Sequence, residues 1–324
     1  MGAGAGPLPQ PRLNADVQVT DAFAAYGEVY IHPLQNLEIT LGGRMSWDRK
    51  DVDRALYPTV SSTTPSLTYS GKIKTDKFTP KLGISYQLDD VLLYATYAQG
   101  YRSAGWANTT ATTLANLQLQ FGIEEEKSYE VGVKSQFFDR KLTLNLAAFQ
   151  AEYNNLQATL VVNGETVVTT SDARIRGLEL EGSLRPLPGL NIYGNLALMK
   201  DKYLSPPPGL YYAHRLKHLS RESYLIGFDY DIDLGQQAGS IQLGADLRHQ
   251  GSAYRNVTNT IDQQSDPYTL VNARIGYRAP DDRFSLTFGA TNLTNKTYYL
   301  LGGENQTRSY QPPREYYLTF GVDF

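Results

Sequence analysis

Four histidines are the residues of this chain that could most directly bind a metal ion: His32, His214, His218 and His249. His214 and His218 are four residues apart, a spacing at which two imidazoles on one helical face bind a single metal. However, Pro206-Pro-Pro-Gly209 lies directly upstream and disfavours regular structure, and no carboxylate lies between the two histidines. We therefore expect no metal site and interpret the pair as solvated loop residues.

The residues present also give little support to catalysis or phosphate binding. The chain has no cysteine, which excludes disulfides and thiolate metal sites. No G-x-S-x-G segment presents a nucleophilic serine, and Gly42-Gly43 and Gly302-Gly303 lack the spacing of a phosphate-binding loop. The net charge of −3 and the pI of about 5.9 give no polyanion-binding signal. We expect no enzyme activity, no cofactor and no nucleic-acid partner.

In the segments that would carry any functional site, apolar and polar residues alternate with a period of two. Phe284, Leu286 and Phe288 alternate with small or polar residues, and the segments 141–148 and 241–248 repeat the pattern. Such alternation indicates β-strands, of which we count about thirteen. Several are about ten residues long, the length of a tilted membrane strand. Full charges occupy polar positions, as a wet lumen allows: Glu38, Arg44, Glu130, Lys134, Glu179, Glu181, Asp246 and Arg248.

The links between these strands alternate in length. Short links are expected near residues 32–36, 88–91, 138–141, 186–190, 233–239 and 279–283, and long ones near 49–77, 103–126, 154–173, 203–220, 253–268 and 300–313. Outer-membrane barrels combine short periplasmic turns with long extracellular loops. The alternation therefore predicts an all-β, antiparallel, up-and-down transmembrane β-barrel. A mean hydropathy of −0.39 agrees with this, because lumen-facing polar residues offset lipid-facing apolar ones.

The expected domain division is an irregular N-terminal tail over residues 1–20 and a barrel over residues 21–324. A bacterial barrel of one chain has an even number of strands with both ends periplasmic. Either residues 11–19 supply a fourteenth strand, or the chain was cut from a longer one. Residues 12–19 alternate poorly, which favours the second alternative.

Five blocks, in order along the chain, resemble segments of TonB-dependent outer-membrane receptors, with small departures at Ala104 and Thr294. The resemblance implies an N-terminal plug, a TonB box and a barrel of about 22 strands; of these, only about 13–14 strands are found here. It also implies that TonB would act only through a region outside this chain. The blocks are residues 94–105 (YATYAQGYRSAG), 125–134 (EEKSYEVGVK), 175–181 (IRGLELE), 292–299 (NLTNKTYY) and 313–317 (PREYY).

The last strand resembles the C-terminal signal that the outer-membrane barrel assembly machinery recognises. Its apolar residues lie on one face of the expected strand, and the terminal residue is aromatic. The resemblance implies that this machinery is a partner of the chain. The residues are Tyr316, Leu318, Phe320, Val322 and Phe324.

Cationic and aromatic residues in the long links form the candidate ligand surface. Such a rim suits anionic, aromatic ferric chelates through charge-assisted hydrogen bonds and stacking. The alternative is that these side chains contact lipopolysaccharide or pack against each other. The candidates are Arg102, Trp106, Tyr211, Tyr212, His214, Arg215, His218, Tyr254 and Arg255.

Three functions remain open for a protein with these features. The first is energy-coupled uptake of a scarce nutrient, a ferric siderophore above all, with this chain supplying barrel wall and extracellular loops in the bacterial outer membrane. The second is a passive, porin-like or structural barrel of about fourteen strands. The third is an outer-membrane lipase, which requires serine and histidine side chains placed together on the barrel wall.

Overall fold

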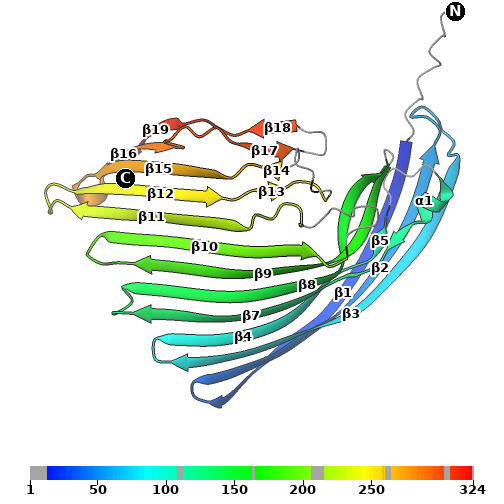
Figure 1. Ribbon diagram of the computed structural model, residues 1–324, viewed down its shortest axis with the longest axis horizontal. Coiled ribbons are helices and arrows are strands. Elements are labelled where there is room, and N and C mark those ends of the chain that lie inside the picture. The colour runs from blue at the N-terminus through cyan, green and yellow to red at the C-terminus, as the bar shows by residue number, and fades with distance from the viewer. Residues whose placement is uncertain are drawn as a thin grey trace, which may run out of the picture.

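A single antiparallel sheet of thirteen strands makes up most of the computed structural model (Figure 1). The structure describes residues 13–107, 113–162, 165–205, 215–257, 259, 264–302 and 307–322. Each strand pairs with its neighbours along the chain, so the topology is up-and-down, and the expected number of about thirteen strands is confirmed. The strands are β1 (Leu13–Leu34), β2 (Leu37–Tyr57), β3 (Leu67–Leu88), β4 (Val91–Arg102), β7 (Glu124–Phe137), β8 (Leu142–Val162), β9 (Glu165–Leu184), β10 (Leu190–Tyr203), β11 (Glu222–Asp233), β12 (Ser240–Gln250), β15 (Tyr268–Arg278), β16 (Phe284–Thr291) and β19 (Glu315–Val322).

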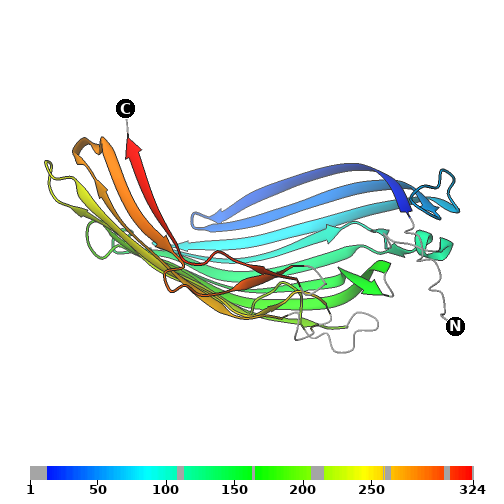
Figure 2. The same ribbon diagram turned by 90° about the horizontal axis from the view of Figure 1, so that it is seen from above.

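The sheet is strongly curved, with β1 and β19 at its two ends (Figure 2). Small elements lie in the longer connections. They are β5 (Gly105–Trp106) paired with β6 (Gln120–Phe121), the helix α1 (Leu114–Gln118), β13 (Ala253–Tyr254) paired with β14 (Gln264–Ser265), the 3₁₀ turn η2 (Pro280–Asp282), and β17 (Tyr299–Gly302) paired with β18 (Thr307–Tyr310). Within the described residues, no helix is long and apolar enough to cross a membrane.

The N-terminal boundary differs from the sequence-based expectation. Residues 13–20, expected to belong to an irregular tail, form the first part of β1 and pair with residues 50–57 of β2. They lengthen the first strand and do not form a fourteenth one. Their poor alternation has a physical reason. Backbone pairing needs no apolar face, and both faces of this part of β1 are largely exposed.

All six short turns fall where the sequence placed them. One of them shows why its residue type is needed: Gly189 precedes β10 with φ +78°, and a Cβ added there would lie 2.0 Å from the carbonyl oxygen of Asp231. Two of the expected long links are instead largely strand. The connection over 49–77 narrows to residues 58–66, and β8 and β9 continue through most of 154–173.

The two faces of the sheet differ in composition, as the alternation predicts. On the apolar face, large side chains are exposed along the described strands; Leu318 and Phe320 are 68% and 65% exposed. On the polar face, charged side chains pair between strands, for example Lys81 with Glu28 at 2.5 Å. An exposed apolar surface of this extent requires a non-aqueous neighbour, so it faces hydrocarbon.

Candidate functional site

The connection between β4 and β7 folds back over the polar face of the sheet. Trp106, 8% exposed, packs against Val52 of β2 and Ile73 of β3. In the same way, Leu117 of α1 packs against Leu56 of β2. The upper part of the polar face of β2 and β3 is therefore apolar, and the chain covers it with its own loop. We call this contact the apolar anchor.

Two hydrogen bonds from basic side chains support the apolar anchor. Lys50 Nζ donates to the carbonyl oxygen of Ala104 at 2.8 Å, and Arg54 Nη1 donates to that of Leu117 at 2.8 Å. The guanidinium of Arg54 also forms an ion pair with Asp16 of β1 at 2.9 Å, which compensates for its burial. The loop is thus fixed directly to β2 and β3, and Arg54 connects this contact to β1.

The structure separates two rim candidates that are close in sequence. Trp106 belongs to the apolar anchor, and its indole N–H has no hydrogen-bond partner in the described part of the chain. Arg102, the last residue of β4, is exposed and lies opposite Glu124 of β7. Of the two, Arg102 is the side chain that a ligand can reach.

A second assembly is built around a buried carboxylate near the end of β10. Asp201 is 1% exposed, and its Oδ2 accepts a hydrogen bond from the Leu216 N–H at 2.6 Å. Its Oδ1 lies 2.9 Å from Arg221 Nε and 3.5 Å from Arg215 Nε. A buried carboxylate is stable only when it is paired and hydrogen-bonded, so these contacts fix the connection between β10 and β11.

Arg215 also joins this connection to the next one, between β12 and β15. Its backbone N–H donates to Asn259 Oδ1 at 2.7 Å, and Asn259 Nδ2 donates back to the Arg215 carbonyl oxygen at 3.0 Å. Its guanidinium lies 5.5 Å from the centre of the Tyr254 ring. The His218 N–H donates to the Tyr254 carbonyl oxygen at 2.6 Å. We call the contacts of Asp201, Arg215, Arg221 and Asn259 the charged anchor.

Two titratable groups beside the charged anchor, both above the membrane-spanning part of the strands, have shifted pKa values. Burial, followed by the positive charges of Arg255 and Lys217, lowers the pKa of His218 below 6.5. Burial and the carboxylate of Asp201 raise the pKa of Tyr203 to about 12. At neutral pH both side chains are therefore uncharged, and the positive charge here comes from Arg215, Arg255 and Lys217.

The nine predicted rim residues thus fall into three groups. Arg215, His218, Tyr254 and Arg255 meet at the two joined connections, whereas Trp106 and Arg102 lie at the β4–β7 loop. Tyr211, Tyr212 and His214 lie outside the described residues. Across the residues that the structure does describe, no group of three or more His, Cys, Asp or Glu side chains is placed to hold a metal ion.

Sequence reasoning missed Asp201 and Asn259, the residues that organise the charged anchor. Asp201 occupies an ordinary polar position in an alternating strand, and its neighbours Lys200 and Lys202 give it no distinguishing context. Asn259 lies in a polar link that contains several other asparagines and threonines. Asn259 is identified only by its contact with Arg215, 44 residues away, and Asp201 only by the way the β10–β11 connection folds back onto it.

Below the connections, the polar face carries pairs of hydrogen-bonded charged and polar side chains. Tyr101 Oη donates to Asp48 Oδ2 at 2.7 Å, and Arg274 Nη2 lies 2.5 Å from Asp229 Oδ1. These contacts join strands on one face of the sheet, which leaves the face polar and wettable. A polar solute or polar protein segment can lie against this wall.

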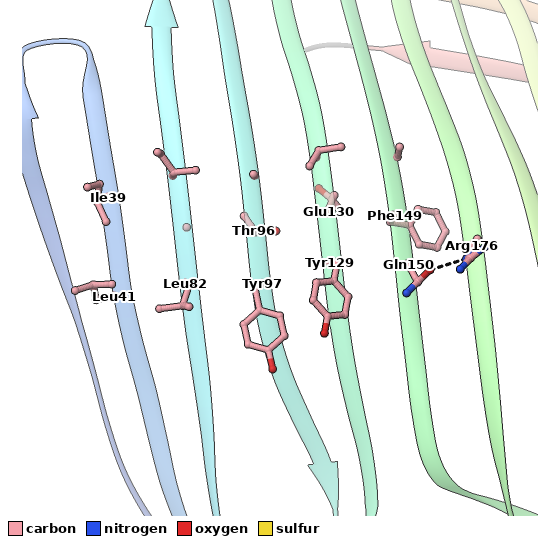
Figure 3. A pocket seen from close by; sticks show the side chains of 15 residues that line it. Ile39, Leu41, Leu82, Thr96, Tyr97, Tyr129, Glu130, Phe149, Gln150 and Arg176 are labelled. Carbon is pink, nitrogen blue, oxygen red and sulfur yellow. Dashed lines mark hydrogen bonds between the residues drawn. The ribbon is translucent and has the colours of Figure 1, made fainter. Parts of the chain in front are cut away.

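A hollow on the opposite face is a poor candidate for ligand binding. Its lining is mostly apolar and includes Leu41, Leu82, Tyr97 and Tyr129 (Figure 3). Leu41 and Leu82 are opposite each other on β2 and β3, on the apolar face. The hollow therefore opens toward hydrocarbon, and acyl chains are its natural occupants.

The chain matches the model of the TonB dependent receptor-like β-barrel family over residues 2–293. It belongs to that family. The thirteen-stranded sheet is accordingly wall of a TonB-dependent receptor barrel, and the chain is a bacterial outer-membrane protein. The family consists of outer-membrane receptors and transporters and not of enzymes.

Relatives of this receptor barrel agree with the family assignment. The ferric-pyoverdine M114 receptor PbuA of Pseudomonas sp. (strain M114) is 26% identical, covering 93% of this chain and 36% of the relative. The ferrichrome outer membrane transporter/phage receptor of Escherichia coli (strain K12) is 26% identical, covering 74% and 29%. The crystal structure of the ferric yersiniabactin uptake receptor FyuA from Yersinia pestis superposes with a TM-score of 0.80 at 21% identity, covering 97% and 47%. This chain therefore spans less than half of the length of each of these three proteins.

Proposed function

We propose that this chain supplies barrel wall and extracellular loops to a receptor that takes up a ferric siderophore across the outer membrane. The observation that carries the proposal is the pair of joined connections above the polar face. These connections carry Arg215, Arg255 and Lys217 at the upper end of the polar face of the sheet. Cations and an aromatic ring at this place suit an anionic ferric chelate. The relatives are named for ferric pyoverdine, ferrichrome and ferric yersiniabactin, and these names support the same substrate class.

In this proposal the chain does not work alone. Energy coupling through TonB and gating by a plug reside in parts of the receptor outside this chain. The chain contributes the conduit and the first contact with the ligand. The apolar side chains of β19, with Tyr316, Leu318 and Phe320 exposed on one face, stay a proposed contact for the assembly machinery. Phe324 lies outside the described residues.

The test is iron-limited growth of a strain that lacks its other siderophore receptors and produces this one. Ferric hydroxamates, ferric catecholates and mixed ferric chelates are supplied one at a time. Growth with at least one ferric chelate supports the proposal. If no chelate restores growth while small sugars enter the cells freely, the receptor is a passive pore and the proposal is wrong.

A charge substitution then tests the assigned binding surface. Arg255→Gln should weaken binding of the growth-supporting chelate about tenfold, since a charge-assisted hydrogen bond contributes roughly 1.5–3 kcal/mol. Arg283→Gln, in the turn between β15 and β16, is the matched control and should leave the affinity for the chelate unchanged. Equal affinities of the wild-type and Arg255→Gln receptors, measured by quenching of intrinsic fluorescence, would remove Arg255 from the site.

A further inference from the structure

The wall divides between β3 and β4. Residues of the two strands pair only up to Lys81 and Ala98, and among the residues that the structure describes no backbone hydrogen bond joins the strands above this point. Both strands nevertheless continue: β3 runs on to Leu67 beside β2, and β4 runs on to Arg102 beside β7. Figure 3 shows the two ribbons diverging beyond Tyr97. We call this division the seam.

Pro80 stands where the pairing between β3 and β4 ends. Proline has no N–H to donate, so within sheets it is confined to strand edges and irregular positions. On the β2 side of β3 the register continues past Pro80 without a shift, from Lys81 opposite Gly42 to Thr79 opposite Arg44. The interruption is therefore confined to the side of β3 that faces β4.

The seam begins inside the membrane. Lys81 lies seven residues from Leu88, where β3 ends at a periplasmic turn. At a rise of ~3.3 Å per residue and a strand tilt of ~40°, this corresponds to ~18 Å along the membrane normal, whereas the apolar band of such barrels is ~25 Å high. The outward residues just above Lys81 agree with this height, because Met45 and Phe78, opposite each other on β2 and β3, are apolar.

Side chains, and not a backbone ladder, hold the seam together. Tyr101 Oη of β4 donates to Asp48 Oδ2 of β2 at 2.7 Å. Lys77 of β3 forms an ion pair with Glu125 of β7. Such contacts are individually weak and can separate and re-form, whereas parting a continuous ladder breaks all its hydrogen bonds. The wall can therefore open here more easily than between fully paired strands.

A hollow of about 590 Å³ borders the seam. Its lining includes residues of β1 and β2 and both edges of the seam, Thr79 on β3 and Gly100 on β4. Two arginines, Arg44 and Arg102, also line it, beside the carboxylate of Asp48. Backbone groups without partners are tolerated at membrane depth only beside protein or water, and a polar hollow supplies both. Polar hollow and hydrocarbon thus meet at the seam without a backbone ladder between them.

We propose that the seam is a lateral opening through which the acyl tail of an amphiphilic ferric chelate passes between the hollow and the outer leaflet. The anionic head lies in the hollow, where Arg44 and Arg102 donate charge-assisted hydrogen bonds. The tail leaves the wall between Thr79 and Gly100 toward hydrocarbon, where its burial is favourable. The inference rests on the proposed uptake of ferric chelates and names a substrate class for it, a chelate with a long acyl tail.

The test closes the seam reversibly in the receptor as cells produce it. Because the chain contains no cysteine, Asp48→Cys/Tyr101→Cys can be joined by a thiol-cleavable linker of the length of the lost tyrosine side chain. The matched control is Ala98→Cys/Ser128→Cys, which joins β4 to β7 where the ladder is continuous. Iron uptake is measured for two chelates with the same head, one with a long acyl tail and one without a tail.

The linker across the seam should slow uptake of the tailed chelate about tenfold, the factor that burial of about two methylene groups supplies. Cleavage of the linker should restore uptake. The tailless chelate should enter at the same rate throughout, and the control linker should affect neither chelate. Unchanged uptake of the tailed chelate, or an equal block of both chelates, would overturn the lateral opening and leave the proposed function intact. If the unmodified receptor takes up neither chelate, the proposed function fails and this inference fails with it.

A second measurement needs no substitution and decides the proposal even if the double variant does not fold. A photoreactive group at the end of the acyl tail is bound with the chelate to the wild-type receptor, and the labelled peptides are identified by mass spectrometry. The label should appear on the outer side of the seam, at Phe78, Pro80 or Gln99. Label confined to the polar face, at Arg44 or Ser46, would show that the tail stays inside the lumen and would contradict the proposal.

Discussion

The apolar anchor and the charged anchor hold different extracellular connections by different means. In the apolar anchor, Trp106 and Leu117 fill a surface formed by Val52, Leu56 and Ile73. In the charged anchor, one buried carboxylate gathers two arginines and a backbone N–H. Apolar packing tolerates many arrangements, whereas a buried charge requires all its partners at once. The comparison indicates that the β4–β7 loop is a fixed cover, while the two joined connections form a unit that a competing charge could release.

The largest effect is expected at the apolar anchor. Trp106→Ala should destabilise the closed position of the β4–β7 loop by roughly 4 kcal/mol, because it removes a buried indole from a packed site. The Ala107 N–H donates to the Leu119 carbonyl oxygen. Its hydrogen exchange should therefore become as fast as that of an amide without a hydrogen bond. Phe138→Ala, at an exposed turn residue, is the matched control. Retained protection at Ala107 would show that packing does not hold this loop.

A somewhat smaller effect is expected at the charged anchor. Asp201→Ala leaves the largely buried guanidinium of Arg215 without this carboxylate, which should cost about 3 kcal/mol. Exchange of the Leu216 amide should become about 100-fold faster, while that of Ala107 stays unchanged. Asp231→Ala, at the other end of β11, serves as the control. Faster exchange at both loops would mean that the two anchors are not independent.

Within the charged anchor, the hydrogen bonds of Asn259 that join the two connections are weaker than the contacts of Asp201. Asn259→Ala removes the two hydrogen bonds with the backbone of Arg215 and should cost roughly 1–2 kcal/mol. The connection between β10 and β11 should remain fixed by Asp201, whereas the connection between β12 and β15 separates from it. A pair of spin labels, one on each connection, measures this separation. An unchanged distance distribution would show that the Tyr254 contacts suffice.

The smallest expected effect is a pH dependence of the two joined connections. It arises from His218, which lies beside the charged anchor and not beside the apolar anchor. The pKa of His218 is lowered in the folded protein, so the unfolded state binds more protons below pH 6.5. The stability that His218 contributes is complete above pH 6.5 and is lost as the pH falls toward its folded-state pKa. The spin-label distance should therefore broaden in acid, and His218→Gln should remove the change. Broadening of equal size in His218→Gln would assign the effect to another group.

The sequence was sufficient for the features that repeat. Alternation such as Phe284, Leu286 and Phe288 predicted the strands and their apolar face, and the turn residues gave the six short connections. It was not sufficient for the upper parts of β1, β2, β8 and β9. In upper β2 the apolar residues change to the other face, where Val52 and Leu56 pack under the β4–β7 loop, so the alternation of the lower strand does not continue there.

The candidate site was predictable only in its general location. Cations and aromatic residues in the long links indicated the rim, and Arg215, His218, Tyr254 and Arg255 indeed lie close together. Sequence could not show that Trp106 is buried or that Asp201 is the centre of the charged anchor. The burial of Trp106 depends on contacts with the distant strands β2 and β3, and the role of Asp201 depends on how the β10–β11 connection folds back onto it; no local pattern encodes either.

The central claim is that this wall and its loops belong to an energy-coupled receptor for a ferric siderophore. The most direct test is uptake of radioactively labelled iron, bound to the growth-supporting chelate, by cells that produce the receptor with or without TonB. The account predicts saturable uptake that disappears when TonB is absent or when an uncoupler collapses the proton gradient. Uptake that continues at the same rate without TonB, and rises linearly with concentration, would contradict it.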